Sequence, residues 1–198
     1  MRLPSVLSVA LFSLAACGDD GASTVDAATE DATQDGPDID AAPPMLTLTS
    51  TAYTDGGTIP SAQACAGRGG MNQSPPLAWG NVPAGTMSFA IVFTDLNNGL
   101  PHSAIYDIPG TATSIPGMVE NAYAPASVPG AHTTRAYTNQ FGYAGPCPNE
   151  PSMYEQRIYA LATATVPNAT MTTTRPELIL ELTANNLGTG TLTAMFSP

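Results

Sequence analysis

Asp95 and His102 stand at the two ends of a short segment rich in Asn, Gly and Pro, residues 96–101. Two β-rich apolar runs, 88–93 and 103–108, flank this segment, which predicts a strand–loop–strand unit. Such a unit can hold a carboxylate and an imidazole at one rim, where both groups reach a small polar ligand. A surface acid and a structural histidine beside a hairpin are the alternative, and the residues alone leave both open.

Other constellations of catalytic residues are poorly supported. The chain has no Gly-x-Ser-x-Gly elbow, no His-Glu-x-x-His pair and no glycine-rich phosphate loop before a helix. Its two histidines and three dispersed cysteines argue against a metal site, and no cofactor is expected. A Ser–His–Asp triad with Ser103 or Ser152 as the nucleophile stays open as the weakest hypothesis, because triads are defined by geometry. We expect a protein that is not an enzyme.

The first 17 residues have the outline of a lipoprotein signal peptide. Arg2 supplies a positive end, and residues 3–14 form an apolar core too short for a permanent membrane span. The core ends in Leu14-Ala15-Ala16-Cys17, similar to a bacterial lipobox, in which the Cys becomes the lipid-modified N-terminus. We therefore expect an exported protein held to the membrane by its lipid anchor alone. Gly18 in place of Asp favours the outer membrane; an ordinary signal peptide with an incidental Cys17 is the alternative.

Residues 18–44 are predicted to be a disordered acidic linker. They hold eight of the sixteen acids, no basic residue and no aromatic residue, so they cannot bury enough apolar surface to fold. Residues 45–198 carry eight acids and four arginines, a net charge of −4, and the whole chain lacks lysine. This balance argues against a nucleic-acid partner.

Residues 45–198 are predicted to form one domain rich in strands. Strands are expected at 45–50, 88–93, 103–108, 152–161 and 191–196, with a loop at 111–121. Residues 122–140 show no clear period. His132, within them, has no carboxylate near it in sequence and is expected to be an exposed loop residue.

The clearest helix is predicted over residues 174–188. Thr174 can cap it, Pro176 suits the first turn, and Glu177 complements the positive N-terminal end of the dipole. Gly188 is expected to end the helix as its C-terminal cap.

Four stretches, in this order, carry a family resemblance. They are Ser74-Pro75-Pro76-Leu77-Ala78-Trp79 with Val82-Pro83-Ala84-Gly85-Thr86; Asp95 and His102 with Asp107-Ile108-Pro109; Gly142-Tyr143-Ala144-Gly145-Pro146-Cys147-Pro148; and Tyr154 with Tyr159-Ala160-Leu161. Together they resemble the phosphatidylethanolamine-binding protein family, in its bacterial Raf-kinase-inhibitor-like branch. The resemblance implies a mainly β fold over 45–198: a β-sandwich with a Greek-key central sheet and a C-terminal helix. Trp79 is expected in the core or in a pocket wall.

The resemblance also implies a pocket for small anions. Matched position by position, it would contain Asp95, His102, Gly145, Pro146, Ser152 and Tyr154. Ser152 stands where the family has a second His, and Asn97 where it has a second Asp. A protonated His102, supported by Asp95, would donate a charge-assisted hydrogen bond to the anion. The turn at Gly145 could add bare backbone N–H groups, or could simply be a rigid turn.

Cys65 and Cys147 remain once Cys17 is assigned to the lipid. An even pair of cysteines in an exported protein is a disulfide candidate, and two separate buried thiols are the alternative. The resembled family often has a Cys at both positions, which favours the bond.

The function expected from these residues is that of a membrane-anchored binding protein with a small-anion pocket. Phosphate, carboxylate or a phospholipid head group would be the ligand. The alternative is a protein-interaction domain, or a protease- or kinase-inhibitor-type domain, with a vestigial pocket. Its exposed loops at 111–140 would then contact an envelope protein.

Overall fold

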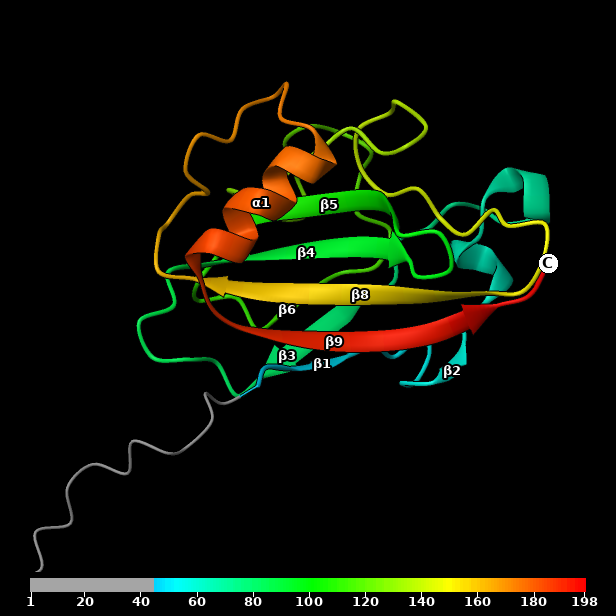
Figure 1. The fold of residues 1–198 in the computed structure, drawn as a ribbon, viewed down its shortest axis with the longest axis horizontal. Helices are drawn as coiled ribbons and strands as arrows, with labels where there is room; N and C mark the ends of the chain where they lie inside the picture. Colours follow the sequence, from blue (N-terminus) through cyan, green and yellow to red (C-terminus); the bar gives the residue numbers. More distant parts are fainter. Residues whose placement is uncertain (1–44) are drawn as a thin grey trace, which may run out of the picture. The chain divides into compact units, whose positions relative to one another are not determined.

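The computed structural model describes residues 45–198, which form two β-sheets packed face to face and one helix (Figure 1). The predicted signal peptide, Cys17 and the acidic linker lie outside the described residues. The smaller sheet has the order β1 (Thr47–Thr49), β3 (Leu77–Gly80), β6 (Ser114–Ile115). The larger sheet has the order β2 (Gly57–Thr58), β9 (Asn186–Phe196), β8 (Ser152–Leu161), β4 (Ser88–Asp95), β5 (Leu100–Pro109), β7 (His132–Thr133). The predicted mainly β sandwich with one C-terminal helix is confirmed.

Strand β4 is the centre of the larger sheet. It pairs antiparallel with β5, the next strand in sequence, and on its other side with β8, which follows a long connection. β8 in turn pairs antiparallel with β9. This return of a later strand to the side of β4 is the Greek-key feature of the sheet, and it brings Asp95 opposite Tyr154.

Both faces of the larger sheet are buried, by different partners. One face packs against the smaller sheet through a core that includes Phe89, Ile91 and Trp79. Trp79 is 6% exposed and its ring lies against Phe89, as predicted for a core residue. The other face packs against helix α1 (Arg175–Asn185) through Ala90, Val92, Tyr106, Leu178 and Leu182. Strand β4 is therefore apolar on both faces, which explains its continuous apolar run.

The loop between β4 and β5 is shorter than predicted. Both strands extend further than their apolar runs, so Asp95 is the last residue of β4 and the loop contains only residues 96–99. Pairing continues through polar and proline residues because the strands already lie side by side. The predicted loop at 111–121 similarly contains the two-residue strand β6, which pairs with β3.

A β-bulge determines where His102 points. Phe93 pairs with Ser103 and Thr94 with Pro101, so His102 is an extra residue in β5 with no partner opposite it. Strict alternation would place His102 on the face of Ala104 and Tyr106, under helix α1. The bulge re-aims the ring, which instead contacts Phe93 and Tyr154 on the opposite face.

The N-terminus of helix α1 was predicted correctly and its C-terminus was not. Thr174 accepts a hydrogen bond from the backbone N–H of Glu177, whose carboxylate accepts one from the backbone N–H of Thr174 in return. The helix ends at Asn185, and Gly188 already lies in β9, paired with Ala160. Asn186 replaces the expected glycine cap because its side-chain amide donates to the carbonyls of Leu182 and Thr183.

His132 was wrongly predicted to be an exposed loop residue. It lies in β7, paired with Tyr106, and its ring is half-buried against Tyr123. Its Nδ1 lies 3.0 Å from Oδ2 of Asp107, a carboxylate 25 residues earlier in the chain. That separation is why no partner was visible in sequence.

Candidate ligand pocket

An open pocket of about 420 Å³ lies at the edge of the larger sheet where β4 ends and where β5 and β8 begin. Four of the predicted site residues line it: Asp95 from β4, His102 from β5, and Ser152 and Tyr154 from β8. All four side chains are buried, with exposed fractions between 1% and 4%. Ser152 and Tyr154 share a face because they are two residues apart in one strand.

Asp95 organises the polar end of this pocket. Its Oδ1 accepts a hydrogen bond of 2.6 Å from the hydroxyl of Ser152 and one of 2.9 Å from the backbone N–H of Asn97. Its Oδ2 accepts from the side-chain amide of Asn98 at 3.2 Å. Both carboxylate oxygens are therefore engaged by the protein, which fixes the hydroxyl of Ser152 and closes the β4–β5 loop.

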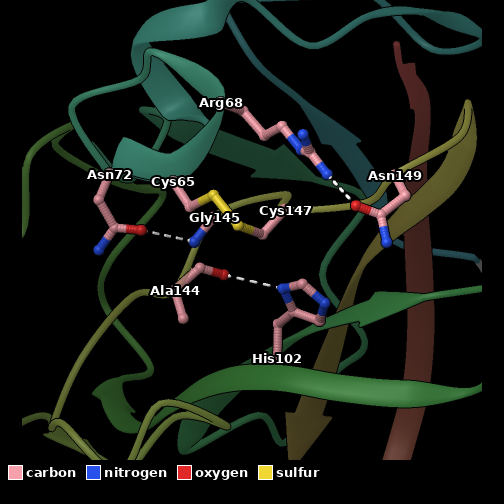
Figure 2. The surroundings of a disulfide bond; sticks show 8 residues. All are labelled: Cys65, Arg68, Asn72, His102, Ala144, Gly145, Cys147 and Asn149. Atoms are coloured by element: carbon pink, nitrogen blue, oxygen red, sulfur yellow. Dashed lines mark hydrogen bonds between the residues drawn. A yellow bond between two sulfur atoms is a disulfide. The ribbon is translucent and has the colours of Figure 1, made fainter. Parts of the chain in front are cut away.

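His102 is held from behind by the backbone of the Gly-Pro segment. Its Nδ1 lies 3.1 Å from the carbonyl oxygen of Ala144, and Figure 2 shows its second ring nitrogen on the side away from Ala144. The ring of Tyr137 covers it at a centroid distance of 4.5 Å. Burial lowers the pKa of His102, and this effect outweighs the opposing effects of the Ala144 carbonyl and of Asp95. Asp95 raises the pKa of His102, as the sequence predicted, but the net direction is downward because the ring is desolvated, which was not visible in the sequence.

Tyr154 presents a buried hydroxyl to the same pocket. This hydroxyl makes no hydrogen bond of regular geometry within residues 45–198, but Asp95, Ser152 and the backbone N–H of Cys147 lie close enough to influence its pKa. Burial, together with the neighbouring charge of Asp95, raises the pKa of Tyr154, so the group stays a neutral phenol that can donate.

Gly145 and Pro146 lie behind the pocket and do not line it. The backbone N–H of Gly145 donates to Oδ1 of Asn72 at 2.7 Å, and Pro146 has no N–H, so the predicted bare donors are not available here (Figure 2). A side chain at Gly145 would overlap the carbonyl oxygen of Gln63, which explains the glycine. The turn therefore acts through Ala144, whose carbonyl orients His102.

The predicted disulfide between Cys65 and Cys147 is present (Figure 2). It joins the loop around the short 3-10 helices Ser61–Gln63 and Ala66–Arg68 to the segment that forms the mouth of the pocket. The side chain of Arg68 donates to Asn149 in that same segment. Cys147 itself lines the pocket.

Several lining residues were not predicted from the sequence. They are Asn97, Asn98, Leu100, Tyr137 and the mouth residues 147–151, of which Cys147 was predicted only as a disulfide partner. Asn98 and Leu100 lie in the segment that the sequence marked as a turn, so proximity to Asp95 could have suggested them. Tyr137 lies in a segment without periodicity and gave no signal.

The lining contains two acids, Asp95 and Glu150, and no Arg or Lys. Among residues 45–198, no group of three or more His, Cys, Asp and Glu side chains is arranged to hold a metal ion. Within the same range, no helix has the length and apolar character needed to cross a membrane.

Comparison with known proteins agrees with this fold. The sequence profile described as phosphatidylethanolamine-binding protein matches residues 49–197, and the chain belongs to this family. A UPF0098 protein of Methanothermobacter thermautotrophicus is 35% identical over 126 residues, which cover 60% of this chain and 78% of that protein. UPF0098 protein YbcL of Escherichia coli is 33% identical over 135 residues, covering 61% of this chain and 70% of that protein.

The crystal structure of E. coli YbcL, described as a new member of the mammalian PEBP family, superposes with a TM-score of 0.70. The superposition covers 77% of this chain and 98% of YbcL, at 27% identity. A protein of Mycobacterium tuberculosis named as a lipoprotein, LppC, is 36% identical over 126 residues, covering 62% of this chain and 55% of that protein. The predicted resemblance, including its bacterial YbcL-like branch, is thereby confirmed.

Proposed function

We propose that the protein is a binding protein, not an enzyme, whose pocket takes a small oxygen-rich acidic group such as a phosphate, a carboxylate or a phospholipid head group. One observation carries the proposal. Asp95, His102, Ser152 and Tyr154 come from three strands and meet at one open pocket of about 420 Å³. A few polar groups that converge in a concave pocket are the usual means by which a protein orients a small polar ligand.

The geometry at Ser152 does not match the serine–histidine pair of the predicted triad. The hydroxyl of Ser152 donates to Asp95 and not to a histidine, so the arrangement that activates the serine in such a triad is not formed. The other serine considered, Ser103, does not line the pocket.

We also propose that the chain is exported and anchored in the cell envelope, at the outer membrane, through lipid on Cys17. The lipobox-like sequence supports this, as does the name of the mycobacterial relative. A Cys17→Ala variant expressed in a bacterium should leave the membrane fraction. Retention of that variant with the membranes would refute the anchor.

The pocket is tested by NMR titration of the protein with phosphate and with acetate, following the two histidine rings. His102 should show saturable shifts, and His102→Ala should lose ligand binding. His132→Ala is the matched control, because His132 does not line the pocket and its loss should leave binding intact. Shifts at neither ring up to millimolar ligand would refute the proposal and favour the interaction-domain alternative, in which an envelope protein is the partner.

A further inference from the structure

His102 faces the pocket as a hydrogen-bond acceptor. A carbonyl oxygen can only accept, so the bond between Nδ1 and Ala144 places the ring proton on Nδ1. In a neutral ring the second nitrogen, Nε2, then carries a lone pair and no proton. Burial, which lowers the pKa of His102, favours this neutral form.

Ser152 also faces the pocket as a hydrogen-bond acceptor. A carboxylate oxygen also only accepts, so the 2.6 Å contact with Asp95 takes the hydroxyl proton of Ser152. The oxygen of Ser152 keeps its lone pairs for the pocket. Ser152 and His102 thus offer two acceptors, and neither can donate to a ligand without breaking an existing hydrogen bond.

Tyr154 supplies the complementary donor. Its ring lies edge-on to His102 at a centroid distance of 5.4 Å, and its hydroxyl has no partner of regular hydrogen-bond geometry in the described chain, although Asp95 and Ser152 lie near it. One acceptor nitrogen and one phenol hydroxyl therefore belong to the same pocket. Two neighbouring oxygens of one ligand, one bearing a proton and one not, match this pair.

The charged groups around His102 add no positive charge to the lining of the pocket. No arginine lines the pocket, and the described chain brings two close to it: Arg68 is bound to Asn149, and Arg175 to the carbonyls of Pro101 and Arg135. The titratable and charged groups around the ring are Asp95 from β4, Tyr154 from β8, Tyr137 from the segment after β7, Glu150 at the mouth, and Arg175 from α1. The lining itself therefore carries negative charge only.

From this arrangement we infer that the pocket selects the protonated form of an oxyacid, a phosphate monoester monoanion or a carboxylic acid, whose O–H donates to Nε2 of His102 while a second oxygen accepts from Tyr154. The inference rests on the proposed function and specifies the ionic form of its ligand. Fully ionised ligands are rejected because their oxygens can only accept and would meet acceptors and negative charge. A phosphodiester is rejected because its oxygens also can only accept, since it has no O–H. The inference therefore narrows the proposed ligands to phosphate monoesters and carboxylic acids, and it excludes the diester head groups of most phospholipids.

Calorimetric titration of the protein with methyl phosphate and with dimethyl phosphate separates the effect of the ligand's O–H from the effect of its charge. Near pH 5 both are monoanions, but only methyl phosphate carries an O–H. Its second pKa is about 6, so its affinity should fall about tenfold per pH unit above that value, to about 100-fold weaker at pH 8. Dimethyl phosphate should bind at least about tenfold more weakly than methyl phosphate at pH 5, the cost of an unpaired buried acceptor. Tyr154→Phe should weaken methyl phosphate by about tenfold while keeping the same pH dependence.

Acetate provides the control for titration of the protein itself. Its pKa lies one to two units below that of methyl phosphate, roughly as for a Glu side chain, so its affinity should begin to fall at a correspondingly lower pH. A common midpoint for both ligands would mean that a protein group titrates, and would overturn the inference. Equal binding of the two methyl phosphates would also overturn it, while leaving the proposed function intact. Binding of neither ligand at any pH, or of methylammonium in their place, would refute both.

Discussion

Removal of the Cys65–Cys147 disulfide gives a stability change that can be worked from the sequence separation. The two cysteines are 82 residues apart, and closing a loop of that length lowers the entropy of the unfolded chain. In the chain-entropy model this contributes about 4 to 5 kcal/mol at 25 °C. Because a domain of this size is stable by roughly 5 to 15 kcal/mol, Cys65→Ala/Cys147→Ala should lose a large part of its stability.

Urea unfolding of the double variant and of the reduced wild type provides the assay. Both should show the same loss in the free energy of unfolding, because they share an unconstrained denatured state. The local contacts should remain, since the backbone bond from Cys65 to the carbonyl of Pro146 and the contact between Arg68 and Asn149 do not need the sulfurs. A loss below about 2 kcal/mol would refute the assignment of the effect to the unfolded chain.

Four further changes test individual contacts. Tyr154→Phe should stabilise the ligand-free protein by about 1 kcal/mol in urea unfolding, because it deletes a buried hydroxyl without a partner; a destabilised variant would mean that the hydroxyl is bonded. The stability of the wild type should fall as the pH drops below about 6.5, since the unfolded chain binds a proton at His102 that the folded ring, with its lowered pKa, resists. His102→Gln should show a shallower fall between pH 7 and 5, and identical pH profiles would refute the burial effect. Asp107→Ala should cost about 2 to 4 kcal/mol, because it strands the buried N–H of Val166 and places alanine at a φ of 58°, whereas Asp107→Asn should recover most of this. Ser152→His should extend methyl phosphate binding to higher pH, because a second imidazole can donate, and an unchanged pH profile would count against the polarity assigned to the pocket.

The fold was predictable from local patterns because most of its elements agree with their own sequences. Thr174 and Glu177 form the capping box that their spacing predicted, and the apolar run before Asp95 is the central strand. The end of the helix was not predictable from the same reasoning. Asn186 caps it with a side-chain amide, and the following residues are drawn into β9 by pairing with β8, a partner far away in sequence.

Some residues of the pocket were predictable from the sequence, and those that were missed have one cause in common. Asp95, His102 and Tyr154 were found because their motif residues survive in sequence, and Ser152 was found by its spacing from Tyr154; the pocket contains all four. Tyr137 and the pairing of His132 with Asp107 depend on contacts across the sheet that no local spacing records. The bulge at His102 is another such feature, since only the register of β4 and β5 reveals that the ring changes face.

The polarity of the site is where residue identity misleads most. An acid beside a histidine predicts a charged pair that attracts anions. In this site, however, the carboxylate of Asp95 accepts hydrogen bonds from Ser152, Asn97 and Asn98. The ring proton of His102 is donated to the carbonyl oxygen of Ala144. Each of these contacts turns a potential donor away from the pocket. A second histidine at position 152 could have carried a proton towards the ligand; a serine bound to a carboxylate cannot. Under the proposed selectivity, a serine in place of a second histidine at position 152 changes which ionic form of a ligand the pocket accepts.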